Sequence, residues 1–323
     1  MKDSCPSVAI RAIVAQHPLV AVPSPRVWIN LNDNGNSGSM AQPPLKVFVI
    51  SLDRAVDRRA HMEGLLSQLG LKAEFVSAVD GRALSEADRG QYDSRLARLD
   101  YRSEMTDTEI ACYLSHYRIY ERICREELPL ALILEDDIHI ESNFMEAVSA
   151  LAAQDDPEWT VARLQTQRGK LLNPRDEQHL GRRVCGLGES GLYQLETHVL
   201  GGCAYLMRLP AARTMVSYAR SISRPIDQTL DRFWENGIVP YIVRPFPVRQ
   251  HPEFGSEIGV RGKESYVKER SADAVLGRLR RARDGINKRI FRAALRRPWL
   301  RGLIGAALPA SARLSLREYA RAR

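Results

Sequence analysis

The sequence predicts an α/β fold, and two observations lead to this prediction. Short apolar runs alternate with segments of helical period from Lys46 onward. The run Leu130–Leu134 is wholly apolar and ends in three adjacent acids, Glu135, Asp136 and Asp137. A continuous apolar run of this length is typical of a strand that is buried on both faces in a parallel sheet.

The elements before the acids form a βαβ unit followed by a capped helix. We predict a strand at Val47–Leu52, a helix at about Asp57–Leu69 that Gly70 ends, and a strand at Ala73–Val79. Thr106 and Glu109 form a capping box, which predicts a helix that begins there and ends at Leu128-Pro129.

The elements after the acids continue the alternation. They are a strand at Val199–Met207 entered by Gly201-Gly202, a helix from about Pro210, a helix at Ile226–Asn236 that Gly237 ends, and a strand at Ile238–Val243. The segment Asp155–Glu196 is rich in Gly, Arg and polar residues and has little period, so we predict loops there.

Composition divides the chain into three parts. Residues 1–44 contain the polar, turn-rich run 32–39 and are predicted to be a disordered leader, so translation starts at either Met1 or Met40. Residues 45–262 are predicted to form the main domain, and residues 263–323 a basic amphipathic helical tail.

Composition and charge also exclude several classes of protein. Polar residues and prolines interrupt the apolar stretch 8–29, so it is predicted to be neither a membrane span nor a secretory signal. Five cysteines without a CxxC pair favour a reducing compartment, hence the cytoplasm. The net charge is +8, but residues 268–323 hold 16 Lys and Arg against 4 Asp and Glu, so the rest is net negative. The body lacks a basic patch interleaved with aromatic residues, and no nucleic-acid partner is expected.

The three acids lie where a ligand site is expected, because ligands of open α/β sheets bind beyond the carboxyl ends of strands. On extended backbone Glu135 and Asp137 point to the same side and Asp136 to the other. Two convergent carboxylates suit a hard cation such as Mg²⁺ or Mn²⁺. The alternative is a solvated acidic turn that caps the next helix.

Seven segments together resemble glycosyltransferase family 25, which comprises bacterial lipopolysaccharide sugar transferases and collagen galactosyltransferases. The resemblance runs from about Val47 to Ile258. The segments are Val49–Arg54 with Arg58 and Arg59, Ala78–Gly81, Glu109–His116, Leu132–Asp137, Gly201–Tyr205, Pro225–Asp227, and Gln250 with Ser256. Ser51 departs from the family, which usually carries Asn at this place.

The resemblance implies a GT-A-like nucleotide-diphospho-sugar transferase fold for residues 45–262, with a Rossmann-like mixed sheet flanked by helices. It implies that Glu135 and Asp137 hold Mn²⁺ or Mg²⁺ and that Asp136 supports them, since a metal shields the charge of a leaving diphosphate. Contacts with the nucleotide sugar are expected from Ser51, Leu52, Asp53, Arg54, Arg58, Arg59, Asp80, His116, Asp136 and Gly202.

Several of these residues also have a purely structural interpretation. Arg58 and Arg59 are then solvated side chains at the start of a helix, and Asp80 is a turn residue. His116 is then a hydrogen-bonded structural histidine, and Gly201-Gly202 marks a β-bulge.

An inverting transfer needs a carboxylate that takes the proton of the acceptor hydroxyl, and the resemblance points to Asp227. The alternative is that Asp227 is an ordinary acid in the first turn of a helix. Asp231, one turn later, is a second candidate for the base, and His251 is a further candidate ligand for metal or phosphate.

The resemblance implies a hexosyltransferase that moves galactose from UDP-galactose onto a lipopolysaccharide or lipooligosaccharide glycan. A glucosyltransferase of the same family is the nearest alternative. A different class also stays open, namely a catalytically silent sugar-nucleotide or glycan-binding protein that acts as a membrane scaffold.

The basic tail carries Ile286, Ile290, Phe291, Ala294 and Leu295 at helical spacing between arginines, and then Trp299, Leu300, Leu303 and Ile304. This pattern is typical of a helix lying in an anionic membrane interface. The tail is therefore expected to hold the protein peripherally at the cytoplasmic face of the inner membrane, close to a lipid-linked acceptor. The alternative is a helix that docks on the body.

Overall fold

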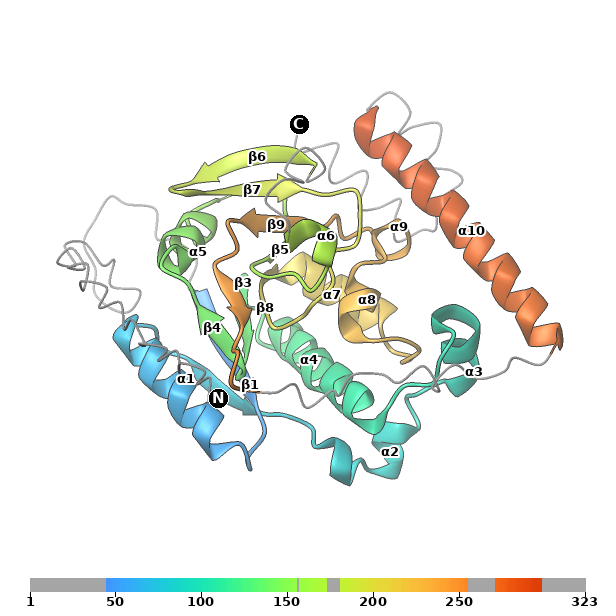
Figure 1. Cartoon of the computed structure of the whole chain (residues 1–323), viewed down its shortest axis with the longest axis horizontal. Helices are drawn as coiled ribbons and strands as arrows, with labels where there is room; N and C mark the ends of the chain where they lie inside the picture. Colours follow the sequence, from blue (N-terminus) through green and yellow to red (C-terminus); the bar gives the residue numbers. More distant parts are fainter. Residues whose placement is uncertain (1–44, 156, 173–180, 255–270, 298–323) are drawn as a thin grey trace, which may run out of the picture. The chain divides into compact units, whose positions relative to one another are not determined.

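The structure is a computed structural model that describes residues 45–155, 157–172, 181–254 and 271–297 (Figure 1). The predicted leader 1–44 with Met1 and Met40, the boundary at 262 and 263, Ser256, and the residues from Trp299 onward lie outside the described residues.

The main sheet has eight strands in the order β2-β1-β3-β8-β5-β9-β7-β6. Its strands are β1 (Leu45–Ser51), β2 (Glu74–Ser77), β3 (Leu130–Glu135), β5 (Val161–Arg163), β6 (Arg182–Leu187), β7 (Ser190–Gln194), β8 (Ala204–Arg208) and β9 (Tyr241–Arg244). β1 is parallel to both β2 and β3, whereas β8 is antiparallel to β3 and β5. The predicted α/β class with a mixed sheet is therefore confirmed.

The longer helices are α1 (Val56–Gln68), α4 (Asp107–Arg125), α5 (Phe144–Ala152), α7 (Leu209–Tyr218) and α10 (Ser271–Arg296). The short ones are η1 (Gly81–Ala83), α2 (Glu86–Arg89), α3 (Ser94–Leu96), the π-helical turn η2 (Ala97–Tyr101), α6 (Gly169–Leu172), α8 (Ile226–Leu230) and α9 (Phe233–Asn236). None of the helices in the described residues is both long enough and apolar enough to cross a membrane.

Helices cover both faces of the sheet because its central strands are apolar on both faces. Val47 and Val49 of β1 belong to one core cluster with α1 and α5, and Phe48 and Ile50 belong to another with α4 and α7. All five residues of Leu130–Leu134 are fully buried in β3, as the apolar run predicts. Figure 1 shows α1 and α5 on one side of β3 and α4 on the other.

The elements predicted before the acids are present, whereas the short helices η1, α2, α3 and η2 between them were not predicted. The predicted βαβ unit is β1-α1-β2, and Gly70 adopts the positive φ of 67° that ends the helix. Thr106 and Glu109 form the predicted capping box of α4, in which the Glu109 carboxylate accepts from the Thr106 N–H at 2.8 Å.

The prediction of loops over Asp155–Glu196 is wrong. The described part of this segment holds β5, α6 and the antiparallel pair β6–β7, which is joined by a turn at Gly188 with φ 65°. β5 is only three residues long and buried throughout, so it carries no alternating pattern that a sequence reader could detect.

Three predicted bounds are corrected. β8 begins at Ala204 instead of Val199, because the residues before it form a loop with positive φ at Leu200 and Gly201. The helix predicted over Ile226–Asn236 divides into α8 and α9. β9 begins at Tyr241 because it follows Pro240, which lacks a backbone N–H.

A two-stranded sheet pairs β4 (Ile138–Ile140) with β10 (Val248–Gln250). In this antiparallel pair Gln250 lies opposite Ile138. The pairing therefore brings the end of the described body next to the acids that follow β3.

The tail helix α10 docks on the body. Phe291, Ala294 and Leu295 belong to the main core cluster, and Phe291 packs against the ring of Phe233 with 5.5 Å between centroids. Ile286 of the same predicted stripe is 55% exposed. The predicted apolar stripe is thus divided between the core and the surface.

Candidate functional site

A pocket opens at the carboxyl ends of β1, β2 and β3. Its wall is completed by the first turns of α4. The residues that line it are Ile50, Leu52, Arg54, Arg58, Ala78, Val79, Gly81, Thr108, Ala111, Cys112, Ser115, His116, Glu135, Asp136 and Asp137. This is the edge of the sheet at which the sequence predicts a ligand.

Asp136 is held by the end of β1 and the start of α1. Ser51 donates from Oγ to Asp136 Oδ2 at 2.8 Å, and Arg58 donates from Nη1 to Oδ1 at 3.4 Å. Burial raises the pKa of Asp136, and these two contacts oppose that rise. The residue that departs from the family, Ser51, is therefore a hydrogen-bond partner of the middle acid.

Asp137 has a buried oxygen atom that is not satisfied. Its Oδ2 accepts from Gln250 at 3.4 Å and its backbone oxygen accepts from the N–H of His251 at 2.8 Å. Its Oδ1 is buried and has no hydrogen-bond partner among the described residues. Burial and the neighbouring Glu135 raise the pKa of Asp137 to about 7. The site therefore holds more negative charge than its own donors compensate.

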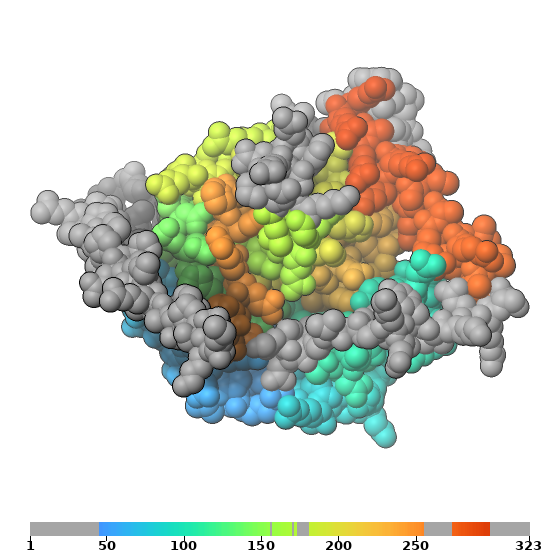
Figure 2. All heavy atoms as spheres, in the orientation of Figure 1, coloured from blue at the N-terminus to red at the C-terminus, as the bar shows by residue number. Residues whose placement is uncertain are grey.

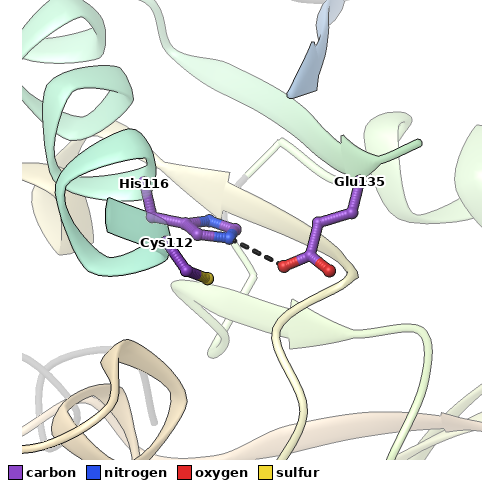
Figure 3. Close-up of side chains that lie close together, drawn as sticks. All are labelled: Cys112, His116 and Glu135. Atoms are coloured by element: carbon purple, nitrogen blue, oxygen red, sulfur yellow. Dashed lines mark hydrogen bonds and ion pairs between the residues drawn. The ribbon is translucent and has the colours of Figure 1, made fainter. Parts of the chain in front are cut away.

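Glu135 is oriented by a chain of three buried side chains. His116 Nε2 lies 3.0 Å from Glu135 Oε1, His116 Nδ1 lies 2.8 Å from the Tyr205 hydroxyl, and that hydroxyl lies 2.8 Å from the Tyr120 hydroxyl. Because a carboxylate accepts only, the network assigns the proton to Nε2, and Tyr205 then donates to Nδ1. Figure 3 shows His116 of α4 directed at Glu135 of β3.

Cys112 lies beside this pair, and its Sγ is within 4.8 Å of the ligand atoms of His116 and Glu135 (Figure 3). Burial, followed by the charges of Glu135 and Asp227, raises the pKa of the Cys112 thiol well above its ordinary value. A protonated thiol is a poor ligand, whereas Glu135 and the unsatisfied Asp137 offer the oxygen donors that Mg²⁺ and Mn²⁺ prefer. Glu135 and Asp137 are therefore the pocket residues whose oxygens could be offered to a hard divalent cation.

Asp227 lies next to the acids without lining the pocket itself. A Cβ placed on Gly202 would lie 3.9 Å from Asp227 Cβ, 4.0 Å from Glu135 Oε1 and 4.0 Å from His116 Nε2. Asp227 Oδ2 accepts from the N–H of Gly201 at 2.9 Å, which fixes the carboxylate against the loop before β8. A side chain at position 202 would therefore be in van der Waals contact with both Asp227 and Glu135.

Asp231, the second candidate for the base, is buried and makes structural contacts only with its neighbours among the described residues. It is 2% exposed, and its Oδ2 accepts from the N–H groups of Val199 and Leu200 at 2.9 and 2.7 Å. Arg163 Nη2 lies 3.6 Å from Asp231 Oδ1, and Arg163 also donates to the backbone oxygen of Gly201. Burial raises the pKa of Asp231 to about 6.

The other predicted nucleotide contacts divide into two groups. Leu52, Arg54 and Arg58 line the pocket, and Asp80 lies at its rim, where it accepts from Arg54 Nε at 3.0 Å. Gly81 is required there, because an added Cβ would lie 2.8 Å from Thr108 Cα.

Three predicted ligands point elsewhere. Asp53 accepts from Ser77 at 2.6 Å, and Arg59 pairs with Glu63 at 3.3 Å and lies over the Phe75 ring. Neither lines the pocket. His251, which was a candidate metal or phosphate ligand, stacks on Phe254 and accepts from the N–H of Glu253 at Nδ1.

Sequence reasoning missed Tyr205 and Arg163 as residues of the site. Tyr205 reaches His116 because β3 and β8 pair with Ile133 opposite Tyr205, and that register has no local signal. Arg163 is 2% exposed and lies on the short strand β5, whose three residues give no sequence pattern that identifies it as a site residue.

Comparison with known proteins gives one consistent result. The sequence profile described as glycosyltransferase family 25 (LPS biosynthesis protein) matches residues 45–230. A glycosyltransferase 25 family member of Drosophila pseudoobscura pseudoobscura is 43% identical over 103 residues, which cover 30% of this chain and 16% of that protein. The human protein named inactive glycosyltransferase 25 family member 3 is 30% identical over 224 residues, which cover 62% of this chain and 36% of that protein.

A bovine protein named probable inactive glycosyltransferase 25 family member 3 is 27% identical over 247 residues, covering 65% of this chain and 38% of that protein. The alignments thus span well under half the length of these relatives. A solved glycosyltransferase involved in the glycosylation of the major capsid of PBCV-1 aligns with a TM-score of 0.28 and 8% identity over 54% of this chain and 65% of that one. That similarity is too low to carry an argument.

Proposed function

The chain belongs to glycosyltransferase family 25, and on this premise we propose that it is a metal-dependent, inverting hexosyltransferase. The donor that we propose is UDP-galactose, and the acceptor is a glycan of the lipopolysaccharide or lipooligosaccharide type. The observation that carries the proposal is the acidic end of β3, where Glu135 and Asp137 face a pocket and Asp137 Oδ1 is buried without a partner among the described residues.

Glu135 and Asp137 are the residues that would hold Mn²⁺ or Mg²⁺. A cation bound there would offset the negative charge that develops on the diphosphate as it leaves. Asp136 does not take part directly, since Ser51 and Arg58 engage its two oxygens. Its role is to fix the backbone between the two metal ligands.

Arg54 and Arg58 supply guanidinium groups to the same pocket, and such groups suit phosphate and ribose oxygens. The apolar part of the wall, formed by Ile50, Leu52 and Val79, gives the nucleoside a surface to pack on. The donor would thus lie with its phosphates toward the acids and its base along the ends of β1 and β2.

Asp227 is the proposed base. Its Oδ1 accepts from the N–H of Gln228 at 2.7 Å and its Oδ2 from the N–H of Gly201, so the carboxylate is fixed while each oxygen retains a lone pair. Gly202 leaves open the space between Asp227 and Glu135. An acceptor hydroxyl in that space could give its proton to Asp227 as its oxygen attacks the anomeric carbon.

A catalytically silent binding protein is the second candidate, because the human relative is named inactive and the bovine relative probable inactive. It predicts the same pocket with bound nucleotide sugar but no turnover. The two functions therefore differ in one measurable quantity, the release of UDP.

The test is UDP release from UDP-galactose, UDP-glucose and other UDP-sugars with and without Mn²⁺. We expect release from at least one donor, dependent on Mn²⁺, and a fall in kcat of about 10²-fold or more in Asp227→Asn with donor binding retained. Glu86→Gln, an exposed acid outside the pocket, is the control and should keep full activity. Donor binding without release from any sugar would instead establish the silent protein.

The tail is proposed to bring the enzyme to an anionic membrane surface and to a lipid-linked acceptor on the cytoplasmic face of the inner membrane. Although part of α10 is docked, Val275, Leu279 and Ile286 are 50%, 63% and 55% exposed. They recur at helical spacing on the outward side of α10, which Figure 2 shows as an orange-to-red band at the surface. The exposed arginines Arg278 and Arg289 flank them.

A further inference from the structure

A second concentration of charge lies where α10 meets the loop between β7 and β8. Lys288 of α10 is half-buried, with its Nζ 4.9 Å from the ring centroid of Trp234 and 5.7 Å from that of Phe233. Within the described part of the chain, no hydrogen bond or ion pair joins Lys288 to a carboxylate. A half-buried ammonium without an acidic partner is uncommon, because burial disfavours the charged form.

Two further cations hold the loop beside Lys288. Arg168 donates from Nη1 to the backbone oxygen of His198 at 2.9 Å, and Arg292 donates from Nε to the backbone oxygen of Glu196. We refer to Arg168, Lys288 and Arg292 as the basic cluster. Its members come from the segment before α6 and from consecutive turns of α10, so the docking of α10 assembles it.

The acids near the basic cluster are already engaged. The Glu196 carboxylate pairs with Arg296 Nη2 at 2.6 Å, and Asp231 accepts from two backbone N–H groups and lies beside Arg163. The carboxylates of Asp231 and Glu196 offset part of the charge on Lys288 and Arg292, but each also has an arginine partner of its own, so an excess of positive charge remains.

Burial and this excess of positive charge both lower the pKa of Lys288 and that of the neighbouring His198. Burial, Arg292 and Arg168 lower the pKa of Lys288 to about 8. Burial, Lys288 and Arg168 lower the pKa of His198 to about 3, and the His198 ring packs edge-on against Trp234 at 5.4 Å. Trp234 Nε1 is in addition a buried donor with no partner among the described residues. Cations and an unused donor together are what an anion site contains.

We propose that the basic cluster of Arg168, Lys288 and Arg292 binds a phosphate group, carried either by the glycan acceptor or by a lipid headgroup. Guanidinium and ammonium groups are the side chains that recognise phosphate, and an anion would remove the unfavourable repulsion among the three. The phosphate binding itself does not depend on transferase activity, whereas its assignment to the acceptor rests on the proposed function.

The loop from His198 to Gly202 links this site to the proposed base. Four residues of extended chain span at most about 14 Å, and Gly202 lies against Asp227 and Glu135. A phosphorylated acceptor could therefore contact the basic cluster while its hydroxyl reaches Asp227. The cluster would then recognise the acceptor, and the pocket at β3 the donor.

The test measures binding of inorganic phosphate to the full chain at pH 7 by ³¹P NMR titration. Lys288→Met keeps an unbranched apolar side chain against Trp234 and removes the charge, so phosphate binding should weaken at least tenfold. Lys72→Met changes an exposed lysine on the loop between α1 and β2 and should bind phosphate as the unaltered chain does. Arg292→Gln provides a second variant if Lys288→Met does not fold. Equal phosphate affinity in the folded variants and in Lys72→Met would overturn the proposal.

Two further probes separate the sources of the phosphate. If Lys288→Met binds a hexose phosphate more weakly than the unaltered chain but binds phosphatidylglycerol vesicles equally well, the phosphate belongs to the acceptor. If it loses affinity for the vesicles alone, the phosphate belongs to a lipid headgroup. Unchanged affinity of Lys288→Met for both probes overturns the proposed phosphate site. Because these measurements need no donor, failure of the phosphate site and failure of the transferase are distinguishable.

Discussion

At the scale of single residues, the surroundings of Asp137 disfavour its ionised form in the protein without ligand. It is 7% exposed, its pKa is raised to about 7 from an ordinary 3.8, and Oδ1 has no partner among the described residues. Above pH 7 the carboxylate is ionised in both states, so the folded state bears the cost. As the pH falls below 7 the folded state binds a proton that the unfolded state does not, and this cost is relieved.

Asp137→Asn should therefore stabilise the metal-free protein. At pH 8 we expect a gain of about 1–3 kcal/mol in the free energy of unfolding, which shrinks toward pH 5. The same variant should lose the stabilisation that Mn²⁺ gives the unaltered chain. Urea unfolding at both pH values, with and without Mn²⁺, measures both effects. A variant that is less stable at pH 8 would contradict this account of the site.

Tyr205 is predicted to position a metal ligand without touching the metal. Tyr205→Phe removes the donor to His116 Nδ1, so the imidazole no longer holds Glu135 through Nε2. Loss of such an outer partner weakens metal binding by about tenfold or more. The control is Tyr113→Phe, which also removes a hydroxyl from a buried tyrosine, one that donates to the backbone oxygen of Ala219. Calorimetric Mn²⁺ titrations that give equal affinities for the two variants would rule out this role.

At the scale of elements, local pattern explains what could be predicted. β1, α1, β3 and α4 were predictable because the two strands are apolar runs, and because Gly70 marks the end of α1 and a capping box the start of α4. β5 was not predictable, since three buried residues carry no period, and the β4–β10 pair joins segments more than a hundred residues apart. Tertiary contacts decide such short elements.

The site shows the same division. The three acids could be found because they follow one conspicuous strand. The other residues Tyr205, Gln250 and Arg163 reach the site through the pairings of β3 with β8, β4 with β10, and β5 with β8. Asp53 and Arg59 have nearer partners on β2 and α1 and do not line the pocket, so their expected contacts with the nucleotide sugar stay predictions.

Arg163 is predicted to fix the loop that precedes β8. It is 2% exposed and contacts the backbone oxygen of Gly201 and the carboxylate of Asp231. Arg163→Met leaves Asp231 buried and uncompensated, so the free energy of unfolding should fall by about 3–5 kcal/mol. Adding Asp231→Asn should restore part of the loss, because it removes that charge.

An exposed ion pair supplies the control for Arg163→Met. Arg249 pairs with Glu141 at 2.8 Å but its side chain is 71% exposed, so Arg249→Met should cost about 1 kcal/mol or less. Denaturant unfolding compares the two variants. Equal losses would show that Arg163 has no special role in the loop.

At the scale of the whole molecule, the basic charge of the tail predicted a membrane-binding role distinct from that of the body. The sequence left open whether the tail docks on the body, and the structure shows that α10 does. Both faces of α10 carry apolar residues, so periodicity alone did not decide which face meets the body. The structure assigns Phe291, Ala294 and Leu295 to the core and leaves Val275, Leu279 and Ile286 outside.

The outward apolar residues of α10 give the membrane proposal its test. Leu279→Ser combined with Ile286→Ser should weaken binding to phosphatidylglycerol vesicles at least tenfold, since each side chain contributes about 1.5–3 kcal/mol when it leaves water. Val56→Ser is the control, because Val56 is 68% exposed on α1. Sedimentation of vesicles measures the bound fraction. Unchanged binding in the double variant would exclude this face of α10 as the membrane contact.

The central claim, that Glu135 and Asp137 hold a divalent cation, is tested most directly by electron paramagnetic resonance of Mn²⁺ with the full chain and UDP. We predict one bound Mn²⁺ per chain in the unaltered protein and in Tyr113→Phe, and none at the same Mn²⁺ concentration in Asp137→Asn. Equal Mn²⁺ binding by Asp137→Asn and the unaltered protein would contradict the claim.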